Sequence, residues 1–410
     1  MVGLAAQTRH RRRARLLPRT RTPPAQRLRR PSRDPRARRP LARIRCRADP
    51  CLARRGTCPV RPPGGRAVNT PNAGRRPVLR FALQIVGFVG GLALLGWCVR
   101  AALSPENREQ LARLGDAPAW SVAVLLGLSA ASVALNGLAF WSALLPARRL
   151  HASDVIATNA LATFLNYLPF KLSAISRVVI HNRRDRVPLL TIGGWFGAVL
   201  GVMAASLVPL VAASLWRQTV DAAWWAVALL GPIAAGGGLV ALARPFADER
   251  GLARLHVILD PLAVGPLRRA LRSERFAQLH AGVTMLADPR AVAIGVSVRL
   301  ADVAVQTARF VLAASILGVA LPWDHAALVA SSYFLISVVS PFGMLGTREA
   351  GTVWLAAALG LVGASDATTH PLVVVTLFIT GTESVVLLAS AALAVLWLRR
   401  TRSRKNMRAA

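Results

Sequence analysis

The sequence predicts an all-α integral membrane protein with about six crossing helices and two re-entrant helical hairpins, arranged as inverted repeats. Hydrophobic residues make up 54% of the 410 residues, and the mean hydropathy is +0.43. They lie in nearly charge-free runs of about twenty residues or more, which is the length that crosses a bilayer. The positions of Lys and Arg in the short loops, and two runs broken by proline, indicate that two of the runs turn back. This pattern excludes an ordinary soluble enzyme.

An Arg-rich and Pro-rich tail, residues 1–78, precedes the membrane domain, which we place at 79–400. The first 80 residues contain 24 Arg, 12 Pro and only two acidic residues. Such a stretch cannot bury enough apolar surface to fold, so the sequence predicts disorder. An arm that binds nucleic acid or anionic lipid and a cleaved transit peptide are alternatives. We favour translation from Val68, with 1–67 not translated, and we expect no nucleic-acid partner.

Eight apolar runs follow the tail. Positive charges in short loops mark the cytoplasmic side of a membrane protein. Arginines before the first run and in loop 146–152 place both segments inside, and the weakly acidic loop 103–119 lies outside. The runs are Phe81–Val99, Trp120–Leu145, Val155–Ile180, Leu189–Leu215, Ala222–Ala243, Ala291–Ala320, Ala326–Val362 and Pro371–Leu398.

The third and seventh runs are each broken near their middle. The third is interrupted at Asn166–Pro169, and the basic residues of 171–186 that follow it would lie outside after a full crossing, against the charge rule. A proline lacks an N–H and clashes with the preceding turn, so it breaks a helix. The seventh run is broken at Ser340–Glu349. We expect both runs to dip into the membrane and return, which leaves both termini, including the basic tail 401–410, in the cytoplasm.

The predicted layout repeats itself in the opposite direction. Residues 120–215 form helix, cytoplasmic hairpin and helix, and residues 291–398 form helix, external hairpin and helix. Inverted repeats whose broken helices meet near the bilayer midplane are typical of transporters and point to the breaks as the substrate site. Between the repeats, 244–290 is predicted to be a cytoplasmic or interfacial segment, because it mixes apolar residues with arginines.

Ionisable residues at bilayer depth cost about 2.5–3.5 kcal/mol each on insertion scales, so they indicate a functional site. The residues expected to bind substrate are Arg348, Glu349, Glu383, Arg299, Asp302, Arg309, Lys171 and Arg177. No H-E-x-x-H, G-x-S-x-G or P-loop motif occurs, and the tail cysteines lack the paired spacing of a zinc site. The scattered histidines lie at loop edges and are expected to be solvated. We therefore expect no enzyme activity, no cofactor and no metal.

Helical spacing groups the first candidates. Arg299, Asp302, Gln306 and Arg309 have offsets of three, seven and ten residues, which fall on one helical face. We expect this face to point into the protein. The structural alternative is an Arg299–Asp302 pair that merely neutralises itself, with Arg309 reaching toward the membrane surface.

The other candidates lie at or near the breaks. Arg348 and Glu349 are adjacent and point apart on a helix, so we expect Arg348 to pair instead with Glu383 in the last helix. A purely structural buried ion pair is the alternative. Lys171 and Arg177 lie at the cytoplasmic edge of the first break, where they either bind a lipid phosphate or act as positive-inside anchors.

The two breaks carry sequence motifs. Pro341–Glu349 reads P-F-G-M-L-G-T-R-E, and Pro169–Arg177 reads P-F-K-L-S-A-I-S-R. The first resembles the late P-x-G-x-G-x-R-E motif of the flippase-like transmembrane family named after the membrane part of lysylphosphatidylglycerol synthase, with one extra residue between the glycines. The second resembles weakly that family's early P-G-R-x-G-E-x-x-R motif: the proline and the two basic positions agree, but Ala174 replaces the glutamate. The resemblance covers residues of about 80–400.

The resemblance implies translocation of a lipid across the cytoplasmic membrane. Full synthases carry a soluble aminoacyltransferase domain after the membrane part, and only 12 residues follow Leu398 here, so we expect no lipid aminoacylation. The sequence favours a transporter that moves a membrane phospholipid or a lipid-linked anionic headgroup between leaflets, with ion coupling as an option. In this hypothesis Arg348 and Arg177 bind the phosphate, and Glu383 and Asp302 hold or release the arginines.

Three alternatives remain open. A secondary transporter of a small soluble solute uses the same inverted repeat. A membrane enzyme of polyprenyl-phosphate glycan metabolism needs a carboxylate pair, for which Glu349 and Glu383 are the candidates. A non-transporting membrane subunit would lose abundance, but no flux, when Arg348 or Glu383 is replaced.

Overall fold

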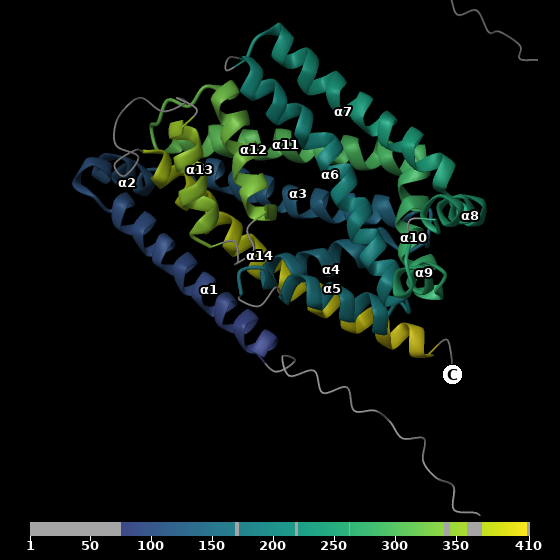
Figure 1. Ribbon diagram of the computed structural model, residues 1–410. Coiled ribbons are helices and arrows are strands. Elements are labelled where there is room, and N and C mark those ends of the chain that lie inside the picture. Colours follow the sequence, from purple (N-terminus) through teal and green to yellow (C-terminus); the bar gives the residue numbers. More distant parts are fainter. Residues whose placement is uncertain are drawn as a thin grey trace, which may run out of the picture. The chain divides into compact units, whose positions relative to one another are not determined.

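The computed structural model describes residues 75–407, apart from 169–171, 218–219, 262, 340–344 and 359–370. Every regular element in these residues is a helix (Figure 1). Six of the helices are long and apolar enough to cross a membrane, and they coincide with the six runs predicted to cross. They are α1 (Arg75–Ala102), α3 (Ala119–Leu144), α6 (Leu189–Arg217), α7 (Ala222–Ala243), α11 (Pro289–Ile316) and α14 (Leu372–Met407).

A pair of short helices replaces each of the two broken runs. Helices α4 (Ala152–Leu165) and α5 (Leu172–Arg183) replace the third run, and α12 (Trp323–Val339) and α13 (Thr347–Ala358) replace the seventh. Helices of 12 to 14 residues extend about 18–21 Å, which is less than a hydrocarbon core of roughly 30 Å. Helices α4, α5 and α13 are therefore too short to cross a bilayer alone. The proline of each break lies outside the described residues.

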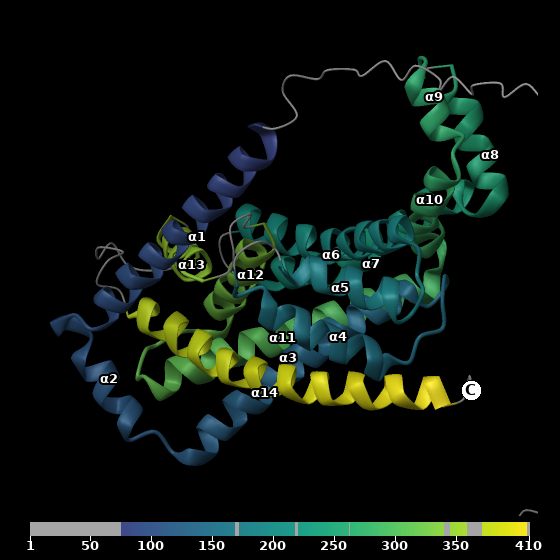
Figure 2. The same ribbon diagram turned by 90° about the horizontal axis from the view of Figure 1, so that it is seen from below.

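Helices α3 and α11 lie side by side and antiparallel, and the other long helices surround them (Figures 1 and 2). Helix α4 packs on α3 as α12 packs on α11. Helix α4 contacts α14 as α12 contacts α6, and α3 contacts α14 as α11 contacts α6. Each of these contacts in the first half of the membrane domain thus has a counterpart in the second. The arrangement also joins the two breaks, because Arg348 in α13 donates through Nη2 to the Tyr167 hydroxyl just after α4, at 3.2 Å.

Short helices flank the long ones. Helix α10 packs against α6 and α7, whereas α8 and α9 extend sideways from them (Figure 2). The predicted segment 244–290 is therefore mainly helical. These elements are the 3-10 turns Pro105–Asn107 and Arg244–Phe246 and the helices α2 (Arg108–Gly115), α8 (Asp248–Leu259), α9 (Pro266–Leu271) and α10 (Glu274–Ala287).

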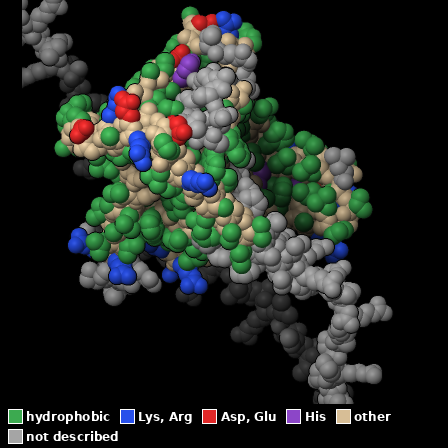
Figure 3. Space-filling model, turned by 90° about the vertical axis from the view of Figure 1, so that its left-hand side faces the viewer, with side chains coloured by type: hydrophobic (Ala, Val, Ile, Leu, Met, Phe, Trp, Pro, Cys, Tyr) green, Lys and Arg blue, Asp and Glu red, His purple; other side chains and the backbone are tan. Residues whose placement is uncertain are grey.

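Charged side chains are unevenly distributed over the face seen in Figure 3. Acidic side chains occur only in its upper part, whereas Lys and Arg occur both there and along its lower edge, and hydrophobic side chains cover much of the area between. Large exposed hydrophobic residues also occur along the long helices, for example Val86 in α1, Leu230 in α7 and Leu388 in α14. Exposed apolar surface of this extent suits contact with lipid rather than with water.

Two glycines allow α6 and α10 to approach each other closely. A Cβ atom at Gly194 would lie 2.5 Å from the carbonyl oxygen of Leu279, and a Cβ atom at Gly282 would lie 2.4 Å from the carbonyl oxygen of Gly194. Both obstacles are backbone atoms, so a side chain at either position fits only if one helix moves.

We expect Gly282→Leu to lower the free energy of unfolding by about 1–3 kcal/mol, because an overpacked contact forces the two helices apart. Thermal unfolding in detergent micelles measures this loss. Gly237→Leu in α7 is the matched control, since nothing lies within 4 Å of a Cβ atom there. An equal loss in both variants would contradict the close α6–α10 contact.

Candidate functional site

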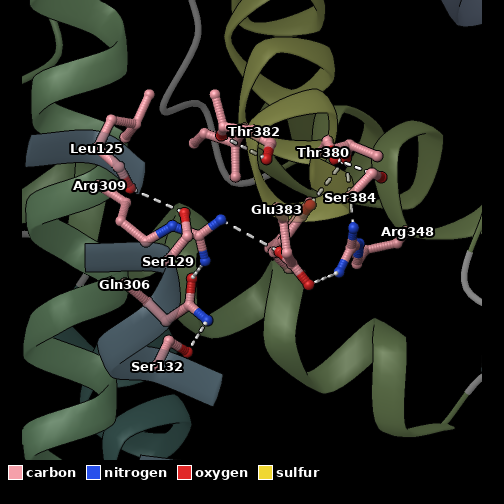
Figure 4. Close-up of polar contacts among 12 residues, drawn as sticks. Leu125, Ser129, Ser132, Gln306, Arg309, Arg348, Thr380, Thr382, Glu383 and Ser384 are labelled. Carbon is pink, nitrogen blue, oxygen red and sulfur yellow. Dashed lines mark hydrogen bonds and ion pairs between the residues drawn. The ribbon is translucent and has the colours of Figure 1, made fainter. Parts of the chain in front are cut away.

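Six of the predicted site residues gather in one buried network around α11. Each is at most 8% exposed. Three are arginines and three are carboxylates, so the formal charges balance. Figure 4 shows the middle of this network, where α11 faces α14 and α13. The six residues are Arg299, Asp302, Arg309, Arg348, Glu349 and Glu383.

Glu383 bridges two arginines from different helices. Arg348 donates through Nη1 to Oε1 of Glu383 at 3.1 Å, as the sequence predicts. Arg309 donates through Nη2 to Oε2 of the same carboxylate at 3.2 Å. The alternative in which Arg309 reaches toward the membrane surface is wrong, because its side chain is only 1% exposed and points to α14 (Figure 4). One carboxylate therefore serves two guanidinium groups.

Arg348 is surrounded by groups from four segments. Its guanidinium lies 4.1 Å from the ring centroid of Tyr333 in α12, which is a cation–π distance. Nη2 also donates to Oγ1 of Thr380 at 3.3 Å, in addition to its bond to the Tyr167 hydroxyl. Glu349 lies 3.5 Å away at its nearest atom, so the neighbour in sequence is the weaker carboxylate partner, as expected.

Glu349 is held in place by backbone and hydroxyl donors. The Thr380 hydroxyl donates to Oε1 at 2.5 Å, and the backbone N–H of Gly346 donates to Oε2 at 2.7 Å. The Tyr333 hydroxyl is 2.8 Å from Oγ1 of Thr380. This carboxylate thus fixes the start of α13 to α14 and sets the position from which the Arg348 side chain leaves the backbone.

A second half of the network runs along α11. Arg309 donates to Gln306 at 2.7 Å, and Gln306 donates to Oγ of Ser132 in α3 at 2.9 Å. The Ser132 hydroxyl donates in turn to Oδ1 of Asp302 at 2.6 Å. Arg299 donates to Oδ2 of Asp302 at 2.7 Å, so the pair within the helix that the structural alternative assumed does form.

The far end of the network reaches α3 and α12. Arg299 donates through Nη2 to Oδ1 of Asn136 at 3.2 Å and lies 4.6 Å from the ring centroid of Phe334. The Nε atoms of Arg299 and Arg309 are buried without a hydrogen-bond partner in the described part of the chain. A buried donor left in this state costs about 1–3 kcal/mol. Both guanidinium groups therefore retain capacity for a further acceptor.

At the first break, Arg177 contacts residues outside this network. Arg177 is half-buried; it donates through Nη2 to Oδ1 of Asn159 at 2.6 Å and lies 4.2 Å from the Phe140 ring centroid. Its Nε is buried and has no partner among the described residues. Lys171 lies outside the described residues. The break contributes Tyr167 instead, which the sequence did not single out.

The rarity of tyrosine in the sequence is a signal that could have identified two further residues of the site. The chain has only two tyrosines. Both contact Arg348, one through its hydroxyl and one through its ring face. Ser132 and Tyr333 were missed because single Ser and Tyr residues in apolar helices carry no periodic pattern that marks them.

Two histidines differ from the expectation that they are solvated. His181 is 1% exposed; its Nδ1 lies 2.9 Å from Oδ2 of Asp185, and its ring packs edge-on against Trp195. His280 is 7% exposed, and its Nε2 lies 2.6 Å from the carbonyl oxygen of Phe246. The expectation was wrong for these two, because the helices that carry them pack against α6.

A separate charged contact, outside the network, joins the α4–α5 segment to the end of α14. Asp154 in α4 is 5% exposed, and its Oδ1 accepts from Arg184 at 2.9 Å and from Trp397 Nε1 at 3.0 Å. Arg184 also donates to the Thr401 hydroxyl at 2.6 Å. These contacts hold α4 and α5 against α14 at the end remote from Glu349. In the described residues, no group of His, Cys, Asp and Glu side chains has the arrangement of a metal site.

Comparisons with known proteins agree with this architecture. A family model described as the lysylphosphatidylglycerol synthase TM region matches residues 82–369, which include both breaks and the polar face of α11. No curated protein and no solved structure gives a significant match. The family match and the six apolar helices together make this a multi-pass membrane protein. The chain belongs to the lysylphosphatidylglycerol synthase TM region family, as the motifs at its two breaks indicate.

Proposed function

We propose that the chain moves a lipid, or a lipid-linked anionic headgroup, between the leaflets of the cytoplasmic membrane and catalyses no covalent reaction. One observation carries the proposal: three arginines and three carboxylates form a buried network at the point where the two broken segments meet. Ionisable residues that face the interior of a membrane protein usually mark a transport pathway. Broken helices that meet in the middle of a membrane domain mark the site in transporters.

The depth of the network supports this function. From Arg299 to Arg309 it follows ten residues of α11, which is about 15 Å at 1.5 Å per residue and half of a hydrocarbon core of roughly 30 Å. Glu383 is the twelfth of the 36 residues of α14, which is about 17 Å from the start of that helix and so near the middle of a core of that thickness. A charged headgroup that crosses the bilayer needs polar contacts over this range, because hydrocarbon offers none.

The shared carboxylate suggests how an anion would bind. Arginine presents planar donors that match phosphate geometry, often through two parallel bonds. A phosphate that reaches Arg309 and Arg348 would compete with Glu383 for the same N–H groups. Release of Glu383 would leave a carboxylate free to accept a proton, which is a route to ion coupling. Arg177, with its unpartnered Nε, would serve as an earlier contact at the first break.

The expected orientation completes the proposal. Both termini lie in the cytoplasm, α4–α5 enters the membrane from that side, and α12–α13 enters from outside. The matching contacts of α3 with α4 and of α11 with α12 support an inverted repeat. In this arrangement a headgroup would pass between the two hairpins while its acyl chains stay outside the polar network.

The test is lipid translocation in proteoliposomes that contain the full chain, with labelled phosphatidylglycerol and labelled phosphatidylcholine. We expect faster translocation of the anionic lipid, and at least tenfold slower translocation by Arg348→Lys, which keeps the charge but loses the planar donors; tenfold corresponds to about 1.4 kcal/mol. Arg290→Lys, at an exposed arginine at the start of α11, is the matched control and should behave as the wild type.

Three outcomes would count against the proposal. Well-folded protein that moves neither lipid would remove phosphatidylglycerol as substrate, and uptake of a soluble solute in the same vesicles would favour the secondary transporter. Equal rates for both lipids would remove the role of the anionic headgroup. Conversion of a polyprenyl-phosphate sugar would show an enzyme instead.

A further inference from the structure

An apolar groove of about 520 Å³ lies where α1 and α2 meet α3 and α14. Its volume is in the range of small-molecule sites in proteins. Eleven of its thirteen lining residues are hydrophobic, and the other two are Gly381 and Thr382. The Thr382 hydroxyl donates to the carbonyl oxygens of Phe378 and Ile379 in its own helix, at 3.1 and 2.9 Å. The groove therefore has no free side-chain donor for an anionic ligand, and its mostly hydrophobic lining suits a hydrocarbon chain.

The walls of the groove include two helices that are long enough to cross a membrane. Leu126 of α3 and Val385 of α14 line the groove and belong to these helices. Leu111 and Leu114 of α2 also line it, whereas the Glu109–Arg113 pair on the same helix is exposed. Helix α2 thus has an apolar face over the groove and a charged face exposed to solvent, as is typical of a helix at a membrane surface.

The groove runs beside the charged network and shares two helices with it. Thr382 lines the groove, and the next residue, Glu383, bridges Arg309 and Arg348. On α3, Leu126 lines the groove, and Leu125 and Ser129 lie next to Arg309 (Figure 4). The two sites are thus back to back on α14 and α3.

We propose that this groove binds one acyl chain of the phospholipid that is being moved, and so holds the lipid beside the network while its headgroup reaches Arg309. The inference rests on the proposed function, because the network is what gives a lipid held here a headgroup site. It identifies the substrate as a phospholipid with a hydrocarbon chain that enters the groove, rather than a soluble anion. The exposed residues Leu103 and Val385, at 64% and 61%, leave the groove open to lipid at its side.

Gly381 offers a direct way to fill the groove. Nothing lies within 4 Å of a Cβ atom at this position. A phenylalanine there would extend into the groove and occupy the space of an acyl chain without striking the backbone. Gly237→Phe in α7 is the matched control, because that position is also open and lies away from the groove. Leu126→Trp is a second groove variant, in case Gly381→Phe does not fold.

The experiment uses the full chain in phosphatidylcholine vesicles with a low fraction of phosphatidylglycerol that carries a diazirine at the end of one acyl chain. After illumination, peptides are mapped by mass spectrometry. We expect labelling of residues 374–385 to exceed labelling of the exposed α7 surface by about tenfold, to fall to the α7 level in Gly381→Phe, and to persist in Gly237→Phe. Translocation should fall in Gly381→Phe and not in Gly237→Phe.

Arg348→Lys separates the two proposals. If both hold, it keeps the labelling and loses translocation. If the chain moves no lipid but the labelling is selective and lost in Gly381→Phe, the groove binds lipid and the proposed function fails. Even labelling of α7 and α14, or unchanged labelling and translocation in both groove variants, would overturn the groove proposal.

Discussion

Glu383→Gln is expected to lower the free energy of unfolding by about 3–5 kcal/mol and to stop translocation, because it leaves two buried guanidinium groups without their shared carboxylate. Arg309 and Arg348 approach Oε2 and Oε1 of Glu383 at 3.2 and 3.1 Å. An amide can accept from one of them but carries no charge to balance either. Thermal unfolding of the purified protein in detergent micelles measures the loss.

A second substitution, which restores the charge balance, tests whether unpaired charge causes the loss of stability. Arg309→Gln/Glu383→Gln removes one positive and one negative charge, and Arg348 keeps Glu349 at 3.5 Å. We expect the double variant to regain at least half of the lost stability, since the coupling between the two sites is what a double-mutant cycle measures. Glu109→Gln, which breaks an exposed pair in α2, should change stability by less than about 1 kcal/mol. A double variant that is less stable than Glu383→Gln would refute the charge-balance explanation.

Gly346→Ala is expected to be the most damaging methyl addition in the described part of the break, with a loss of about 3 kcal/mol or more. Gly346 has φ +76°, which an alanine adopts at a cost of about 1–3 kcal/mol. A Cβ atom would also lie 1.9 Å from the Gly91 carbonyl oxygen and 2.6 Å from the Leu95 nitrogen, both in the backbone of α1. Either α1 or the start of α13 must move, and the N–H bond to Glu349 moves with it.

The unfolding temperature and the translocation rate of Gly346→Ala are the measurements. Gly90→Ala is the control on α1, because nothing lies within 4 Å of its added Cβ atom. That control should be neutral or more stable by up to about 1 kcal/mol, since alanine favours a helix over glycine. Wild-type stability in Gly346→Ala would mean that α1 does not approach the break as closely as described here.

Much of the fold follows from local patterns in the sequence. Long apolar runs predict α3, α6 and α11 because a bilayer requires a helix of that length. The breaks follow from proline and glycine, and the polar face of α11 follows from the 3.6-residue period. These patterns depend only on residues near one another in the chain, so they can be recognised without the tertiary structure.

The rest of the site depends on how separate helices are turned toward each other. Periodicity places Arg309 on one face of α11, but it does not state whether α14 or lipid lies opposite. Tyr167, just after α4, and Tyr333 in α12 reach Arg348 only because both helices pack against the centre of the membrane domain. His181 is buried for the same kind of reason, since Trp195 of α6 covers its ring. The Tyr167–Arg348 contact joins residues 181 positions apart, and a contact of that kind leaves no local pattern in the sequence.

The rarity of tyrosine makes the protein unusually convenient for spectroscopy. Because the chain has two tyrosines and both touch Arg348, isotopic or fluorine labelling of tyrosine places every such probe in the same small volume. The NMR spectrum of a fluorotyrosine-labelled sample should contain two resonances, with no background from other parts of the chain. Their shifts would report ligand arrival and rearrangement of the arginine in a single titration, without any cysteine introduced for labelling.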